Sequence, residues 1–139
     1  MASIIQVSEA ASLALHSMIM LAASPDRPLT VKEITARSNA SEAHLSKVMQ
    51  RLAKAGLVKS TRGPKGGFIL GDDGLSIRLL DIFESIEGPM NDAGCLLNVK
   101  TCPFRECLFG GLLNRMTAEF KDYMKTKTLG DMVPGKNKE

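Results

Sequence analysis

Several features typical of membrane, secreted and nucleotide-binding proteins are missing from this sequence. No apolar run approaches the roughly 18 residues of a membrane-spanning helix, and no positive charge precedes an apolar run at the start, as it does in a secretory leader. Gly66-Gly67 is followed by apolar residues 68–70, whereas a nucleotide-binding P-loop continues with Lys and then Ser or Thr. We therefore expect a cytoplasmic protein without a membrane partner, and the glycine-rich segment needs another explanation.

Histidine and cysteine are also scarce. His16 and His44 are the two histidines and fall in predicted helices, so a thiol enzyme with a histidine base has little support and we expect no enzymatic activity. Cys95 and Cys102 are separated by six residues, and Cys102 and Cys107 by four, without the close pair typical of structural zinc. Their odd number favours a metal, a cluster or thiol chemistry over disulfides. An iron–sulfur cluster tolerates this spacing but requires a fourth ligand; a thiol switch or unrelated buried cysteines are the alternatives.

Charge is unevenly distributed along the 139 residues, whose formal net charge is +3. Residues 1–71 contain nine Lys and Arg against four Asp and Glu, a net +5, and residues 72–139 contain nine against eleven, a net −2. The basic half is typical of a module that binds a polyanion, and it is joined to a second half that is slightly acidic and has another function.

Three helices are predicted in the basic half. Each begins at a residue whose hydroxyl can accept a backbone N–H: Ser8, Thr30 and Ser41. Thr30 also forms a capping box with Glu33. The helices end at Ser24-Pro25, Ser38-Asn39 and Gly56. The apolar stripe of the third helix consists of Ala43, Leu45, Val48, Met49 and Leu52. The second and third helices, joined by a tight polar turn, form a helix-turn-helix.

Residues 57–70 are predicted to form a β-hairpin, because apolar residues flank a turn that contains three glycines, Arg62 and Lys65. Helices followed by a hairpin indicate a winged helix, in which the third helix enters the DNA major groove and the hairpin, or wing, contacts the minor groove or backbone. Solvent-exposed side chains without a DNA contact are the alternative. The candidate DNA-binding residues are Ser41, Glu42, His44, Lys47, Arg51, Lys59, Thr61, Arg62, Lys65, Gly66 and Gly67.

Two further helices are predicted after the wing. One covers residues 75–88, and a loop follows over 88–103. From about 103 to 127, apolar residues spaced by four, three, four and three positions predict a long helix with a heptad seam. A second copy of the chain is the simplest partner for this seam, and packing against its own domain is the alternative. The seam consists of Phe109, Leu113, Met116, Phe120 and Tyr123, widened by Leu112 and Met124.

Segments along nearly the whole chain resemble the Rrf-type family of bacterial winged-helix regulators, to which IscR and NsrR belong. The most specific are the Arg-Gly-x-x-Gly-Gly-aromatic wing at 62–68 and the Glu-Gly-Pro at 87–89, which precedes the three cysteines. The resemblance implies a homodimer that crosses its C-terminal helices and contacts a palindromic operator in double-stranded DNA. It also implies an iron–sulfur cluster on the cysteines, of 2Fe-2S type with 4Fe-4S as the alternative, although some relatives work without one.

A fourth cluster ligand is implied by the same resemblance. Some relatives use a histidine three residues after the last cysteine, but Gly110 occupies that position here. Others use an acidic residue at the start of the partner's first helix, where the register points to Ser12, with Glu9 one turn upstream. Glu9 is therefore our first candidate, followed by His16 and Glu106.

These observations predict a mainly helical protein with a small β-hairpin wing, in which a winged helix-turn-helix domain precedes a long dimerisation helix. We divide it into a DNA-binding domain (1–87), a cysteine loop (88–107), a dimerisation helix (108–130) and a flexible tail (131–139). The predicted function is a dimeric transcriptional repressor that senses redox state, nitric oxide or iron–sulfur supply through a cluster. The alternative is a cluster-free regulator of the same fold that responds to thiol oxidation or to a small-molecule effector.

Overall fold

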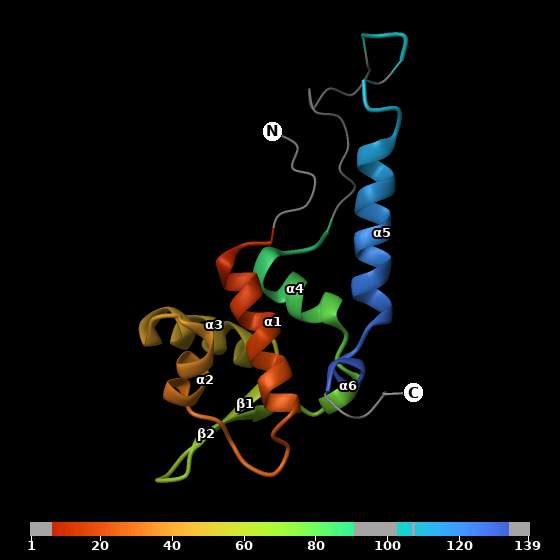
Figure 1. The fold of residues 1–139 in the computed structure, drawn as a ribbon. Coiled ribbons are helices and arrows are strands. Elements are labelled where there is room, and N and C mark those ends of the chain that lie inside the picture. The colour runs from red at the N-terminus through yellow and green to blue at the C-terminus, as the bar shows by residue number, and fades with distance from the viewer. Residues whose placement is uncertain (1–6, 91–102, 107, 134–139) are drawn as a thin grey trace.

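The structure, a computed structural model, describes residues 7–90, 103–106 and 108–133. Within these ranges the order is three helices, a two-stranded hairpin, a 3-10 turn and three further helices (Figure 1). This order confirms the predicted winged helix-turn-helix fold. In the part of the chain that is described, every helix is too short or too polar to cross a membrane.

The first two helices begin at the predicted caps. Helix α1 is Glu9–Ala22, and the Ser8 hydroxyl accepts the backbone N–H of Ala11 at 3.0 Å. Helix α2 is Val31–Ser38, and Thr30 and Glu33 form the expected capping box, in which each side chain accepts the other's backbone N–H, at 3.1 and 2.9 Å. These bonds satisfy N–H groups that a helix start leaves without partners.

Helix α3 is Glu42–Lys54, capped by Ser41. Its buried residues match four of the five positions in the predicted stripe: Leu45, Val48, Met49 and Leu52. Ala43 is exposed, so its assignment to the core was wrong. A residue two positions from Leu45 lies about 200° around a helix, on the opposite face.

The wing consists of β1, Val58–Thr61, and β2, Gly67–Leu70, paired antiparallel with Val58 opposite Leu70. A backbone bridge joins β2 to Leu29 in the connection between α1 and α2. Leu29 donates to the carbonyl of Phe68 at 3.0 Å and accepts from the Phe68 N–H at 2.8 Å. The wing is therefore held on its second edge by a residue about 40 positions earlier in the chain.

Helix α4 is Leu79–Glu87, four residues shorter at its start than predicted. A 3-10 turn, η1, covers Gly74–Ser76, and Arg78 then pairs in a backbone bridge with Thr128. This extended pairing, with hydrogen bonds from the Leu79 N–H to the Lys127 carbonyl and from the Leu129 N–H to the Ile77 carbonyl, both at 2.9 Å, prevents α4 from starting earlier.

Helix α5 is Leu112–Thr126, and it begins nine residues after the predicted start. Gly111 precedes it in the left-handed conformation, with φ of +81°, which breaks the helical geometry that the heptad spacing predicted across this point. A short helix, α6, Leu129–Met132, follows, and Leu129 is fully buried. Helix α6 thus includes residues 131 and 132 of the predicted tail, and residues 134–139 lie outside the described residues.

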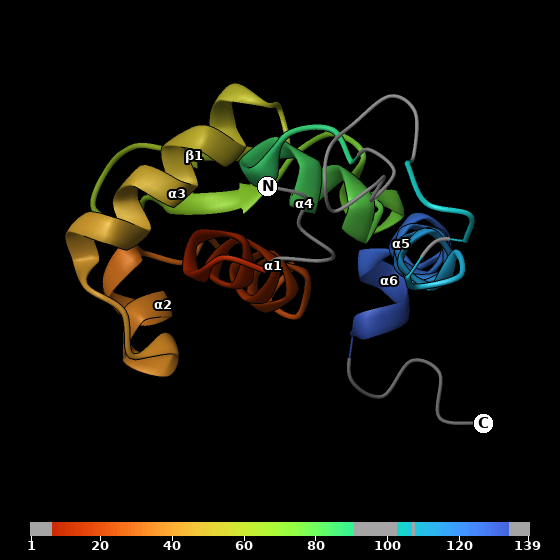
Figure 2. The same cartoon turned by 90° about the horizontal axis from the view of Figure 1, so that it is seen from above.

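The core lies where α1, α3 and α4 meet, and it includes Met18, Ile34, Met49 and Ile82. Figures 1 and 2 both place α2, α3 and the wing on one side of α1 and place α5 and α6 on the other. Phe120 of α5 packs edge-on against Phe83 of α4, with ring centroids 5.5 Å apart. Helix α4 thus connects the helix-turn-helix to α5.

Candidate nucleic-acid interface

Most of the exposed residues of α3 form a stripe on the face opposite its core contacts. They recur at three- and four-residue spacing, as one helical face requires: Ala43, Lys47, Gln50, Arg51 and Lys54. Of these, sequence reasoning identified Lys47 and Arg51 as candidate DNA-binding residues. The same spacing, counted from Lys47, could have indicated Gln50 and Lys54.

The predicted DNA-binding residues at the start of α3 differ in their exposure and in their hydrogen bonds within the protein. The hydroxyl of Ser41 accepts the backbone N–H of His44 at 3.0 Å, so its first role is to cap the helix. Glu42 and Lys47 are exposed, and His44 is half-buried. The structure brings these four residues together at one end of α3.

Arg51 is exposed, and one nitrogen of its guanidinium also makes a contact within the molecule. Its Nη2 donates a hydrogen bond of 2.7 Å to the backbone carbonyl of Ile86, in the last turn of α4. This candidate DNA-binding side chain is therefore tied to α4 in the free protein.

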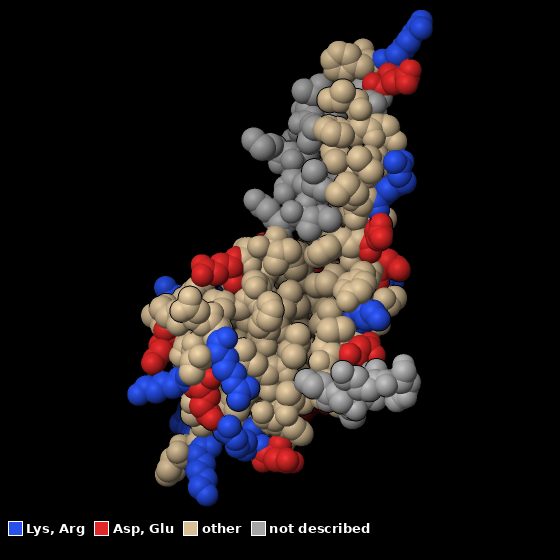
Figure 3. Space-filling view, in the orientation of Figure 1, with Lys and Arg blue, Asp and Glu red and all other residues tan. Residues whose placement is uncertain are grey.

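The cations of the wing fall into two groups. Lys59 on β1 forms an ion pair with Asp72, so a neighbouring carboxylate offsets its charge. Arg62 and Lys65 lie in the turn between the strands and are exposed, beside the half-buried Gly66. Lys and Arg side chains gather over α2 and the end of the wing in Figure 3. Arg62 and Lys65 are therefore the wing side chains most available to an external anion.

Two predicted wing residues have internal contacts that explain their identity. The Thr61 hydroxyl donates to the Gly67 carbonyl at 3.3 Å across the hairpin. Gly67 has φ of +153°, and a Cβ atom there would lie 2.5 Å from the backbone oxygen of Leu29. Glycine at this position permits the bridge that holds the wing, whatever contact it makes with DNA.

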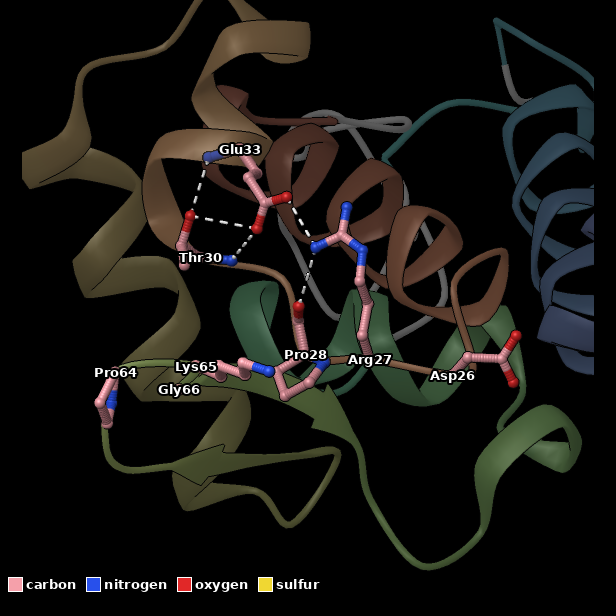
Figure 4. Close-up of a pocket in the computed structure, with 8 residues that line it drawn as sticks. All are labelled: Asp26, Arg27, Pro28, Thr30, Glu33, Pro64, Lys65 and Gly66. Atoms are coloured by element: carbon pink, nitrogen blue, oxygen red, sulfur yellow. Dashed lines mark hydrogen bonds and ion pairs between the residues drawn. The ribbon is translucent and has the colours of Figure 1, made fainter.

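A pocket of about 620 Å³ lies between the wing and the start of α2, and Figure 4 shows Arg27, Glu33 and Lys65 among its lining residues. Arg27 forms an ion pair of 2.7 Å with Glu33. The hydrogen bond from the Thr30 backbone N–H, followed by that from Arg27, lowers the pKa of Glu33 below its ordinary value. Glu33 thus stays ionised and offsets Arg27, while among the described residues no carboxylate pairs with Lys65.

The proposed cluster ligands are only partly covered by the structure. Cys95, Cys102 and Cys107 lie outside the described residues, and within the described ranges no three His, Cys, Asp or Glu side chains converge as a metal site. Glu9 is exposed in the first turn of α1. The Ser8 N–H donates to the Glu87 carboxylate at 3.1 Å, so Glu9 lies close to the end of α4, where the chain continues toward the cysteines.

The Rrf2 family, described as an iron-dependent transcriptional regulator, matches residues 7–135. The chain belongs to the Rrf2 family. This match confirms the resemblance found in the sequence, and Rrf2 proteins are transcriptional regulators rather than enzymes. A candidate HTH-type transcriptional regulator of Aquifex aeolicus is 30% identical over 129 residues, which cover 91% of this chain and 90% of that protein.

Two other Rrf2-type relatives differ in how their lengths compare with this chain. The regulator IscR of Klebsiella pneumoniae is 28% identical over 106 residues, which cover 76% of this chain and 65% of IscR. The structure of CymR, the global cysteine regulator of Bacillus subtilis, is 31% identical with a TM-score of 0.77, covering 93% of this chain and 96% of CymR. The chain therefore spans about two thirds of that IscR and nearly all of CymR.

Proposed function

We propose that this Rrf2 protein is a dimeric repressor that binds a palindromic operator through α3 and the wing. The observation that carries the proposal is that α3 and the wing, which bear these exposed side chains, lie on the opposite side of α1 from α5 (Figures 1 and 2). Side chains of α3 would contact base edges, and the two wing cations would contact phosphates or the adjacent minor groove.

A second copy of the chain would bind along α5. Three large apolar side chains of this helix, Leu112, Met116 and Tyr123, are 40–51% exposed and follow one face at helical spacing. Pairing of these faces would hold two copies of α3 at a fixed separation. An operator with two half-sites at that separation then engages both copies at once.

We further propose that Cys95, Cys102 and Cys107 hold an iron–sulfur cluster of 2Fe-2S type, with Glu9 as the fourth ligand. The family's description as iron-dependent and the soft thiolate donors support this assignment. When bound, the cluster would supply a group that changes with redox state, nitric oxide or iron–sulfur supply. The thiolates of one chain and Glu9 at the start of the other chain's α1 would tie the segment after α4 to the partner.

The cluster is tested by anaerobic purification followed by iron and sulfide assays and visible absorption. If the protein holds a 2Fe-2S cluster, we expect about two iron and two sulfide ions for each chain. The Cys102→Ser variant should contain neither iron nor sulfide. Replacement of Glu9 by Gln should weaken retention of iron without affecting the three thiolates. A colourless, iron-free protein would exclude the cluster and leave the DNA-binding proposal intact.

DNA binding is tested by the salt dependence of affinity. Replacing both Arg62 and Lys65 with Ala should reduce the slope of log K against log salt by roughly 2 for each subunit, at about 0.9 for each phosphate contact. Arg115→Ala with Lys125→Ala removes the same charge from exposed positions on α5 and should leave the slope unchanged. If both double variants changed the salt slope equally, Arg62 and Lys65 would not be phosphate contacts.

The nearly complete overlap with CymR favours a second candidate, a cluster-free repressor of the same fold that responds to thiol oxidation or to a small-molecule effector. In this case the protein would bind its operator without iron. Reversible loss of affinity after mild oxidation, absent in Cys102→Ser, would support the thiol response. A Cys102→Ser variant that regulates normally would leave the effector response.

A further inference from the structure

Arg51 connects the end of α4 to the helix that we propose to contact DNA. The acceptor of its 2.7 Å hydrogen bond is the carbonyl of Ile86, in the last turn of α4, where carbonyls have no partner within the helix. A guanidinium at this position makes a charge-assisted bond and also neutralises the negative end of the helix dipole. The contact is partly buried and joins residues 35 positions apart in the sequence.

Other polar contacts converge on the same end of α4 from both sides of the molecule. The Ser8 N–H donates to Glu87 at 3.1 Å, and the Met90 N–H donates to the Glu84 carboxylate at 2.9 Å. From α5, the Lys121 ammonium lies 3.4 Å from the Met90 carbonyl and donates to it. Residues 84–90 therefore contact α1, α3 and α5 through separate hydrogen bonds.

These contacts give Arg51 a role different from that of a phosphate ligand. We propose that Arg51 is a positioning residue that couples the orientation of α3 on DNA to the end of α4, and through it to α5. The inference rests on the proposed DNA-binding function. Because coupling between two sites is reciprocal, DNA bound to α3 must stabilise residues 84–90, and a change at these residues must alter DNA affinity.

Hydrogen exchange of the Gly88 and Met90 amides measures this coupling, because both amides donate to Glu84, through its carbonyl and its carboxylate respectively. The variant is Arg51→Met, which keeps the apolar stem and removes the donor. The matched control is Lys54→Met, which removes one positive charge from an exposed position one turn further along α3.

In the free protein, Arg51→Met should raise exchange at both amides about tenfold, as expected from the loss of one hydrogen bond to a charged group. Lys54→Met should leave exchange unchanged. Arg51→Lys, which retains a cationic donor, should restore at least half of the protection. If Arg51→Met unfolds the protein, Arg51→Gln, which removes the positive charge, takes its place, and unchanged exchange in the variant used would overturn the proposal.

The second arm uses a DNA duplex that the native protein selects from a random-sequence pool. DNA should lower exchange at Gly88 and Met90 at least threefold in the native protein and should have no effect in Arg51→Met. The slope of log K against log salt should be the same for Arg51→Met and the native protein. If the slope of Arg51→Met is lower by about 0.9 and its exchange without DNA is unchanged, Arg51 is a phosphate contact instead. If the native protein selects no duplex, the proposed DNA-binding function is wrong. Exchange in the free protein still tests whether Arg51 stabilises the end of α4.

Discussion

Helices α1 and α5 have nearly equal lengths, 14 and 15 residues, but α1 buries seven side chains and α5 buries three. Helix α1 lies inside the winged helix, where α3 and α4 cover its apolar surface. Helix α5 directs Leu113, Thr117 and Met124 inward, and Phe120 packs against α4, while Leu112, Met116 and Tyr123 remain exposed. One chain is enough to bury the apolar face of α1, whereas the described part of one chain leaves most of α5 exposed, including these three apolar side chains.

This contrast separates two kinds of stability in the molecule. The winged helix gains its apolar burial from a single chain, so its folding should not depend on protein concentration. In the proposed dimer a second chain buries the exposed face of α5, so that burial should depend on protein concentration. A substitution can therefore affect either folding or assembly, according to the helix face that carries it.

The largest expected effect comes from a charge placed in the exposed apolar face of α5. Met116→Lys should convert the dimer to a monomer and lower operator affinity by roughly 100-fold or more, because the second half-site contact becomes a separate binding event. Sedimentation and operator titration measure the two quantities. Thermal unfolding of the winged helix should change little.

The matched control places the same charge on another face of α5. Ala118 is exposed and lies two residues from Met116, about 200° around the helix. Ala118→Lys should keep both the dimer and the native operator affinity. Dissociation in Ala118→Lys, or an intact dimer in Met116→Lys, would contradict the assignment of the dimer face.

A smaller effect is expected where the wing joins the winged helix. In Gly67→Ala, the new Cβ would approach the Leu29 oxygen to 2.5 Å, and the free energy of unfolding should fall by about 1–3 kcal/mol. Gly63 also has a positive φ, +103°, but a Cβ atom there would meet nothing within 4 Å, so Gly63→Ala should lose less stability than Gly67→Ala if the close contact matters. If urea titrations gave equal losses of stability for the two variants, the positive φ would account for the loss and the contact with Leu29 would not.

The smallest effect is the pH dependence of the capping box at the start of α2. The pKa of Glu33 is lowered in the folded protein by the Thr30 backbone N–H and by Arg27, so the unfolded chain binds the proton more tightly. The stabilisation is therefore complete above the ordinary glutamate pKa and is lost as the pH falls through the lower, folded value. Urea unfolding from pH 6 to 3 should show this loss in the native protein and a smaller one in Glu33→Gln. Parallel curves would exclude the contribution of Glu33.

Local signals in the sequence were sufficient for the first three helices and the wing. Ser8, Thr30 and Ser41 cap their helices as predicted, because a cap depends on residues within one turn. Arg62 and Lys65 lie in the turn between β1 and β2, as the apolar residues around them predicted.

The errors arose where distant segments compete with local preference. Residues 77 and 78 look helical in the sequence, but they pair with the chain after α5, about 50 positions later. The bridge from Leu29 to β2 and the bond from Arg51 to Ile86 likewise join residues 39 and 35 positions apart. Helical periodicity and cap residues contain no information about such contacts.

The pairing of residues 77–79 with 127–129 determines where α5 can pivot. A helix of 15 residues is about 22 Å long, and the backbone hydrogen bonds at its final turn fix that end to the start of α4. By simple geometry on this length, a rotation of about 10° at the fixed end displaces the other end by about 4 Å. A rotation of α5 about this end would therefore move the opposite end, at Leu112, much further than the end that is fixed to α4.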